Sequence, residues 1–94
     1  MMLNCEEIIK NESIEEIILF FSGQPGGIGY IKLDQLFVLF RHSAIADGEL
    51  LLTTQRMYRE GMIENRGHSM VFFKGLNWKE PAFMTKKKIR HRMK

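Results

Sequence analysis

At 94 residues the chain is long enough for one domain with a single hydrophobic core. Apolar residues make up 45% and charged residues 27% of it, the balance of a globular protein, and no apolar run reaches the roughly 18 residues that a membrane-spanning helix needs. The first residues are acidic and lack the basic and apolar regions of a signal peptide, so we expect a cytoplasmic protein without membrane contact. Cys5 is the single cysteine, which excludes an internal disulfide and a cysteine-based zinc site.

The net charge of +3 is unevenly distributed along the chain. Residues 86–94, KKKIRHRMK, hold six of the 14 lysines and arginines and none of the 11 acids, so residues 1–85 carry about −3. We therefore divide the chain into one domain over residues 1–85 and a basic C-terminal tail over residues 86–94. Such a tail can contact nucleic acid or an acidic protein, or it can be a solvated end.

The most secure helix is predicted after Ser13. Ser13 and Glu16 fit the S-x-x-E capping box, which satisfies free N–H groups at a helix start. The apolar residues that follow fall on one helical stripe, namely Ile14, Ile17, Ile18 and Phe21. Asn4 with Glu7 is a second start signal further upstream, and Ser22-Gly23 ends the helix.

Residues 23–29, GQPGGIG, form a glycine-rich connector. The connector lacks the Gly-Lys-Ser/Thr of a P-loop and the strand-to-helix context of a dinucleotide-binding loop, so a phosphate site is not expected there. Residues 28–32 are expected to form a short strand that pairs with a later hairpin. A second helix is predicted over residues 33–46, and its apolar stripe, thickened by Val38 and Leu39, favours a central place in the core.

A third helix is predicted from Leu51 or Thr53 to Glu60. Thr53 or Thr54 is the expected N-cap. Its buried face is expected to hold four residues and the glycine that ends the helix, which are Leu50, Thr54, Met57, Tyr58 and Gly61.

Gly61 suits the left-handed position just after a helix. A hairpin is predicted next, with strands at residues 62–64 and 69–74 and a turn at residues 65–67. In the irregular segment that follows, Trp78 and Phe83 are expected to cover one edge of the core.

The order of helix, short strand, helix, helix and two-stranded hairpin resembles the winged helix-turn-helix domain. The resemblance rests on residues 33–74. It is strongest over residues 52–67, LTTQRMYREGMIENRG, which is similar to a recognition helix, its terminal glycine and the start of a wing. It implies a small α+β fold with three helices, a C-terminal β-hairpin and a short extra strand. It also implies that the recognition helix, about 53–60, enters the major groove of DNA, while the wing, about 62–74, contacts neighbouring backbone.

Carried over position by position, the resemblance assigns a set of binding residues. They are Thr53, Thr54, Gln55, Arg56 and Arg59 on the recognition helix, Asn65, Arg66 and His68 at the wing tip, and Lys86, Lys87, Lys88 and Arg90 in the tail. Threonine can bind phosphate, and glutamine and arginine match the edges of adenine and guanine. The leading hypothesis is therefore a non-enzymatic regulator of transcription, or an accessory protein of a mobile element, that binds double-stranded DNA.

The alternative hypothesis is a stoichiometric inhibitor that acts by protein–protein binding, such as a toxin immunity protein, an antitoxin or a phage anti-defence protein. Such proteins are short, single-domain and free of catalytic residues. An acidic surface that could face a basic toxin is formed by Glu6, Glu7, Glu12, Glu15 and Glu16. A homodimer would suit the DNA-binding hypothesis, since dimers read palindromes, and the helix with Ile8 and Ile9 is its candidate interface.

No catalytic constellation is recognisable, and we expect neither enzymatic activity nor a cofactor. His42, His68 and His91 stand apart from any nucleophile at a known spacing, and no serine lies in a nucleophile elbow. No cluster of His, Cys and Asp has the spacing of metal ligands, so no metal is expected.

Overall fold

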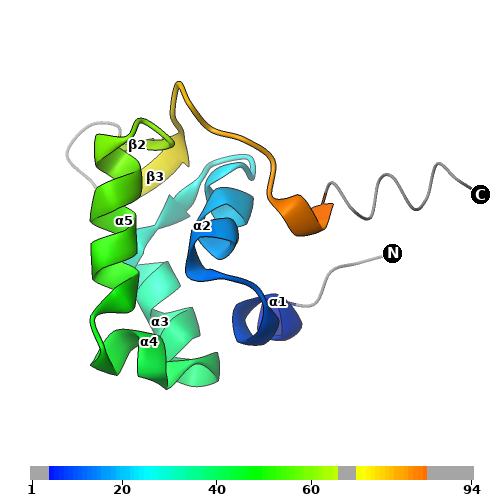
Figure 1. Cartoon of the computed structure of the whole chain (residues 1–94), viewed down its shortest axis with the longest axis vertical. Coiled ribbons are helices and arrows are strands. Elements are labelled where there is room, and N and C mark those ends of the chain that lie inside the picture. Colours follow the sequence, from blue (N-terminus) through cyan, green and yellow to red (C-terminus); the bar gives the residue numbers. More distant parts are fainter. Residues whose placement is uncertain (1–4, 66–69, 85–94) are drawn as a thin grey trace, which may run out of the picture.

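The protein, described from a computed structural model at residues 5–65 and 70–84, is a small α+β fold with a three-stranded antiparallel sheet (Figure 1). Its elements are α1 (Cys5–Asn11), α2 (Ile14–Ser22), β1 (Ile28–Gly29), α3 (Tyr30–Phe40), α4 (His42–Ala46), α5 (Glu49–Arg59), β2 (Ile63–Asn65) and β3 (Val71–Lys74). A short helical stretch follows at residues 82–84. The α+β class is therefore confirmed, whereas the expected number of three helices is wrong.

Helix α2 starts as the sequence predicts. The backbone N–H of Glu16 donates to Ser13 Oγ at 3.2 Å, so Ser13 is the N-cap. The carboxylate of Glu16 accepts a hydrogen bond from the backbone N–H of Ala82 at 3.3 Å, which holds the C-terminal segment against α2. The apolar stripe of α2 is buried in the core.

The helix predicted over residues 33–46 is divided into α3 and α4. It starts earlier than expected, at Tyr30, so the predicted strand over residues 28–32 is reduced to Ile28–Gly29. The chain leaves the helical region at Arg41, where φ is −156° and ψ is 62°. Arg41 Nη1 donates to the backbone carbonyls of Ile9 at 3.3 Å and Glu12 at 2.6 Å. The break therefore places a guanidinium on free carbonyls at the end of α1, where a helix lacks its own donors.

The sheet has the strand order β1–β3–β2, so the short strand pairs with the hairpin as expected. Ile28 lies opposite Phe72, and Glu64 lies opposite Phe73. Gly27 precedes β1 with φ at 66°, and a Cβ atom at this position would lie 2.3 Å from the carbonyl oxygen of Phe72. Only glycine satisfies both constraints without a shift of the backbone.

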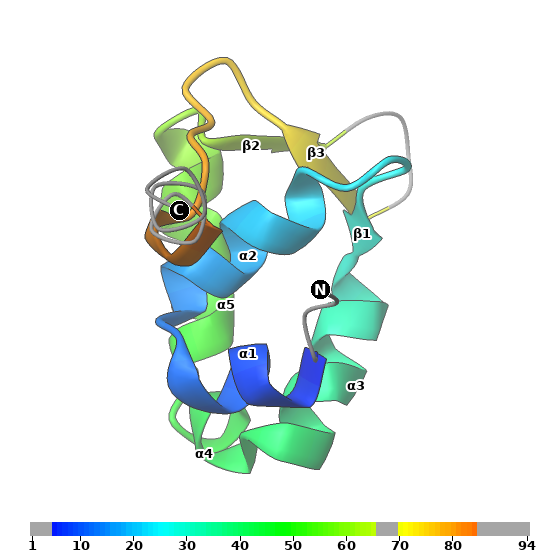
Figure 2. The same cartoon turned by 90° about the vertical axis from the view of Figure 1, so that its right-hand side faces the viewer.

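The core lies where α1, α2, α3 and α5 meet the sheet, and α1 and α2 lie in front of α5 in Figure 2. Ile8 and Ile9 are buried within the chain, so these two side chains are not exposed for a contact between two copies of α1. Trp78 Nε1 donates to the carbonyl of Leu19 at 3.0 Å, and Phe83 is buried. The segment after the hairpin therefore covers an edge of the core, as the sequence predicts.

Candidate functional site

Helix α5 is longer at its N-terminus than the sequence predicts. It begins at Glu49, directly after Gly48, whose φ of 73° is left-handed. Thr53 and Thr54 therefore lie inside the helix, and the prediction that one of them is the N-cap is wrong. Thr54 is 4% exposed, and its hydroxyl donates to the carbonyl of Leu50 at 2.7 Å. The structure thus places Thr54 in the core and leaves Thr53 half-buried.

Arg56 is held by carboxylates of the protein itself. Its Nη2 lies 2.6 Å from Glu15 Oε1 on α2, and its Nη1 lies 3.0 Å from Glu60 Oε1. The hydrogen bond to Glu15 raises the pKa of Arg56 above its usual value, and the negative charges of Glu15 and Glu60 add to that rise against an opposing effect of burial. Arg56 therefore joins α5 to α2 and is not free to bind another molecule without breaking two ion pairs.

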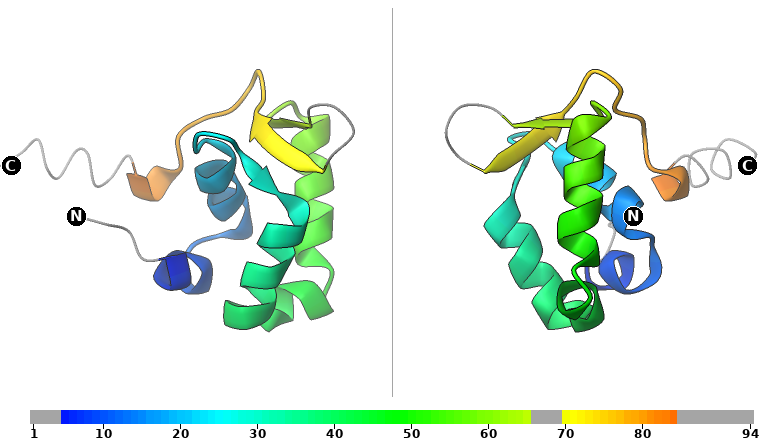
Figure 3. Two further views of the ribbon diagram at one scale, coloured as in Figure 1. Left: turned by 180° about the vertical axis from the view of Figure 1, so that it is seen from behind. Right: turned by 60° about the vertical axis from the view of Figure 1, so that its left-hand side comes forward.

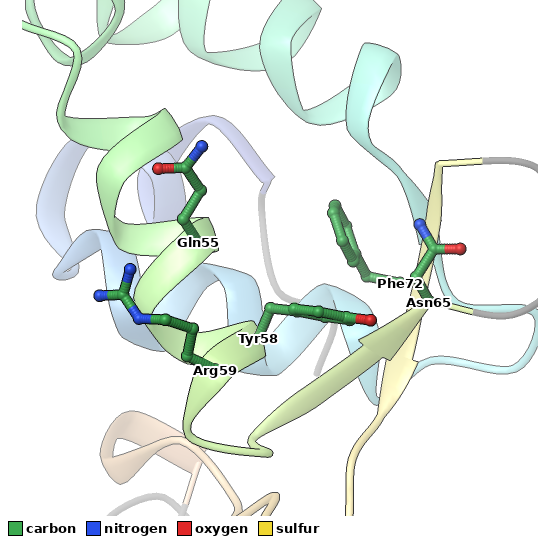
Figure 4. Close-up of a pocket in the computed structure, with 5 residues that line it drawn as sticks. All are labelled: Gln55, Tyr58, Arg59, Asn65 and Phe72. Atoms are coloured by element: carbon green, nitrogen blue, oxygen red, sulfur yellow. The ribbon is translucent and has the colours of Figure 1, made fainter.

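Arg59 is the second arginine of α5, and it is exposed. Among the residues that the structure describes, no carboxylate pairs with its guanidinium. Gln55 is also exposed and lies one helical turn earlier. These two side chains extend outward from α5 in Figure 4.

A hollow of about 600 Å³ lies between α5 and the sheet, and its lining residues are Gln55, Tyr58, Arg59, Asn65 and Phe72. The ring of Tyr58 extends from α5 toward the strands, and the ring of Phe72 extends from β3 toward α5 (Figure 4). Phe72 is buried, so it presents an apolar surface at the inner side of the hollow. The described lining of the hollow therefore combines two aromatic rings with two amides and one unpaired cation.

Large apolar side chains extend this surface along α5. Leu52 is 64% exposed and Tyr58 is 54% exposed, and Leu51 is exposed as well. We call Leu51, Leu52, Gln55, Tyr58 and Arg59 the α5 face. Figure 3, in its right-hand view, shows α5 in the foreground, with α4 at its lower end and the hairpin at its upper end.

Helix α3 also exposes apolar residues. Ile31, Val38 and Leu39 are exposed, so the prediction that Val38 and Leu39 thicken the buried stripe is wrong. Leu33 and Phe37 form the buried stripe of α3 instead.

The structure describes six of the sequence-predicted binding residues, and it brings three of these six together. Gln55, Arg59 and Asn65 line one hollow. Thr54 lies in the core, Arg56 pairs with Glu15 of α2, and Thr53 is half-buried outside the hollow. The other predicted residues lie outside the described residues, and these are Arg66, His68, Lys86, Lys87, Lys88 and Arg90.

Sequence reasoning missed Leu51, Leu52 and Tyr58 as exposed residues. It placed Tyr58 on the buried face together with Leu50 and Thr54. On a wheel of 100° per residue, Leu51 lies about 40° from Gln55, so a helix that includes Leu51 predicts its exposure. Tyr58 lies about 40° from the buried Thr54, so the wheel alone does not predict that Tyr58 is exposed.

The described part of the chain is acidic, since it contains all 11 acids but only half of the 14 lysines and arginines. Within residues 5–65 and 70–84, no three acidic, histidine or cysteine side chains are grouped as metal ligands would be. In the same ranges, no helix has the length and apolar character needed to cross a bilayer. Comparisons of the chain with protein-family models, with curated proteins and with solved structures find no match.

Proposed function

We propose that this chain is a non-enzymatic binding protein whose α5 face contacts a protein partner. The observation that supports it most is that Leu51, Leu52 and Tyr58 are all exposed on one helix, together with an unpaired Arg59. Exposed apolar side chains that are contiguous mark interaction sites more often than isolated ones do, and tyrosine and arginine are enriched in protein interfaces. A stoichiometric inhibitor is one form that such a protein takes.

We also infer that the fold is winged-helix-like. The order α2, β1, α3, α5, β2 and β3, with β1 next to β3, supports this inference. In this interpretation α1 and α4 are additional to the three helices of a winged-helix domain, which correspond to α2, α3 and α5. The fold does not decide between a protein partner and DNA, because winged-helix-like domains serve as scaffolds for both.

The electrostatics of the described residues favour a protein partner over a duplex. Affinity for DNA comes largely from lysine and arginine contacts with phosphate. On α5, however, Arg56 is neutralised by Glu15 and Glu60, and only Arg59 stays unpaired. Two exposed leucines beside Arg59 offer no hydrogen bond to a base edge.

Binding to duplex DNA is the second candidate, and one observation favours it. Gln55, Arg59 and Asn65 line the same hollow, and their side chains are of the types that read base edges. If DNA is the ligand, Arg59→Ala weakens retention on a duplex at two salt concentrations, and Arg56→Ala has a smaller effect. Equal retention of both variants and of the unchanged chain would rule out reading by α5.

Photo-crosslinking tests the protein-binding proposal directly. A benzophenone amino acid is placed at Leu52 or Arg59 on the α5 face, in cells that express the chain, and at Lys10 or Lys79 as exposed control positions on other elements. We expect one defined protein adduct at positions 52 and 59, resistant to nuclease, and none at positions 10 and 79. A nuclease-sensitive adduct, or adducts at the control positions alone, would refute the proposal.

A further inference from the structure

We propose that the hollow beside Arg59 receives an acidic side chain with an apolar neighbour from the partner protein. The inference depends on the proposed function, because it specifies what the α5 face recognises. Three properties of the residues described around the hollow carry it: the aromatic walls, the unpaired Arg59 and the amide groups.

The aromatic walls fit an apolar anchor. Phe72 closes the inner side of the hollow and Tyr58 forms the side toward α5. Anchors in protein interfaces are apolar or aromatic side chains that enter such pockets and lose their contact with water there. A volume of about 600 Å³ accommodates one large side chain together with its neighbour.

The positive charge of Arg59 selects a negatively charged residue next to the apolar anchor of the partner. Arg59 has no carboxylate partner among the described residues, whereas Arg56 has two. A guanidinium binds a carboxylate through two parallel hydrogen bonds, and the amide of Gln55, one turn earlier on α5, can donate to the same group. Asn65 lies on the opposite side of the hollow, beyond Tyr58 (Figure 4). A lysine or arginine from the partner would face a like charge at this point.

A carboxylate fits the hollow better than a phosphate group does. Phosphate-binding peptide sites use clusters of arginines. Among the described residues that line this hollow, Arg59 is the only cation. The partner segment is therefore an acidic one with an adjacent large apolar residue.

Selection from a random peptide library displayed on phage tests this inference with the full chain. We expect the selected peptides to contain aspartate or glutamate next to a large apolar residue, enriched several-fold over the starting library. Arg59→Glu should reverse the preference, so that lysine or arginine takes the acidic position. Lys79→Glu changes the total charge equally at an exposed site away from the hollow, and it should leave the acidic preference intact.

Three results would overturn the inference: no enriched sequence, the same peptides with Arg59→Glu, or basic peptides with the unchanged chain. Its failure can be distinguished from failure of the proposed function. If the protein adduct at position 52 forms and Arg59→Glu leaves its yield unchanged, the α5 face binds a partner but Arg59 does not select for acidic residues. If no adduct forms at position 52 or 59, the proposed function itself is wrong.

Discussion

Arg56 and Glu15 lie 41 positions apart in the sequence, and Arg56 Nη2 approaches Glu15 Oε1 to 2.6 Å. The pair joins the outer side of α5 to α2. The two arginines of α5 therefore have different roles: Arg56 contributes to the fold, while Arg59 remains available to a partner. Arg56 and Arg59 are three positions apart on the same helix, so they form a matched pair for mutagenesis.

Substitution of Arg56 should lower stability more than substitution of Arg59. The side chains of Arg56 and Glu15 are 40% and 30% exposed, so solvent screens their ion pair. We expect Arg56→Ala to lower the free energy of unfolding by about 0.5–1 kcal/mol. Arg59→Ala should change it by less than about 0.5 kcal/mol. Urea unfolding followed by the fluorescence of Trp78 measures both values, and an equal loss in the two variants would contradict the assigned roles.

Gly27 should tolerate alanine less well than Gly26. Both residues have positive φ, at 66° and 84°, so each alanine costs about 1–2 kcal/mol in backbone strain. A Cβ at Gly27 would also meet the carbonyl of Phe72 at 2.3 Å, whereas nothing lies within 4 Å of one at Gly26. We expect Gly27→Ala to be the less stable variant by about 1–3 kcal/mol, from the overpacking alone. The melting temperatures of the two variants test this difference. Equal values would show that the backbone at Gly27 is not packed tightly against the carbonyl of Phe72.

Arg41 should hold α1 in place. Its guanidinium donates to two carbonyls at the end of α1, and hydrogen bonds to charged groups contribute about 1.5–3 kcal/mol to stability. In Arg41→Ala we expect faster amide hydrogen exchange in α1 than in α2. Arg41→Lys keeps the charge and should restore part of the protection. Unchanged exchange in α1 would mean that its burial, through Ile8 and Ile9, holds it without Arg41.

Tyr30 should make the protein less stable at high pH. Burial, and after it the charge of Asp34, raise the pKa of Tyr30 above its usual value of 10.0. The folded state thus favours the neutral hydroxyl, so this contribution to stability is complete below pH 10 and is lost as the pH rises through the raised pKa. We expect the unchanged chain to lose stability relative to Tyr30→Phe above pH 10 and to keep a constant difference below it. If the curves of stability against pH for the two proteins stay parallel over the whole pH range, the raised pKa of Tyr30 is contradicted.

Local signals in the sequence predicted the local features of the fold. The cap at Ser13 and the left-handed Gly61 depend on residues within one helical turn, and both are present. The hairpin and the pairing of the short strand were also predicted, because β-forming residues and turn residues alternate there. Asn65, predicted as the first residue of the turn at the wing tip, belongs instead to β2, where it lies opposite Phe72, and the rest of the predicted turn lies outside the described residues.

Features that depend on distant contacts were not predictable from the pattern. The helix break at Arg41 is stabilised by carbonyls 29 and 32 positions away, and Arg56 finds its partner 41 positions away. Hydrophobicity alone also placed Leu39 in the core, whereas the packing of α3 leaves it exposed. The start of α5 at Glu49 was missed because Gly48 begins it without a side-chain cap, and that shift changed the interpretation of its exposed face.

Two matched leucine variants test whether the α5 face is the binding surface. Leu52 on α5 and Leu39 on α3 are 64% and 72% exposed, so glutamate at either position should leave the fold intact. The measurement is the Kd of each variant for the partner recovered by crosslinking. We expect Leu52→Glu to abolish binding and Leu39→Glu to bind like the unchanged chain. Full binding by Leu52→Glu, with loss in Leu39→Glu, would show that the partner binds α3 and not the α5 face.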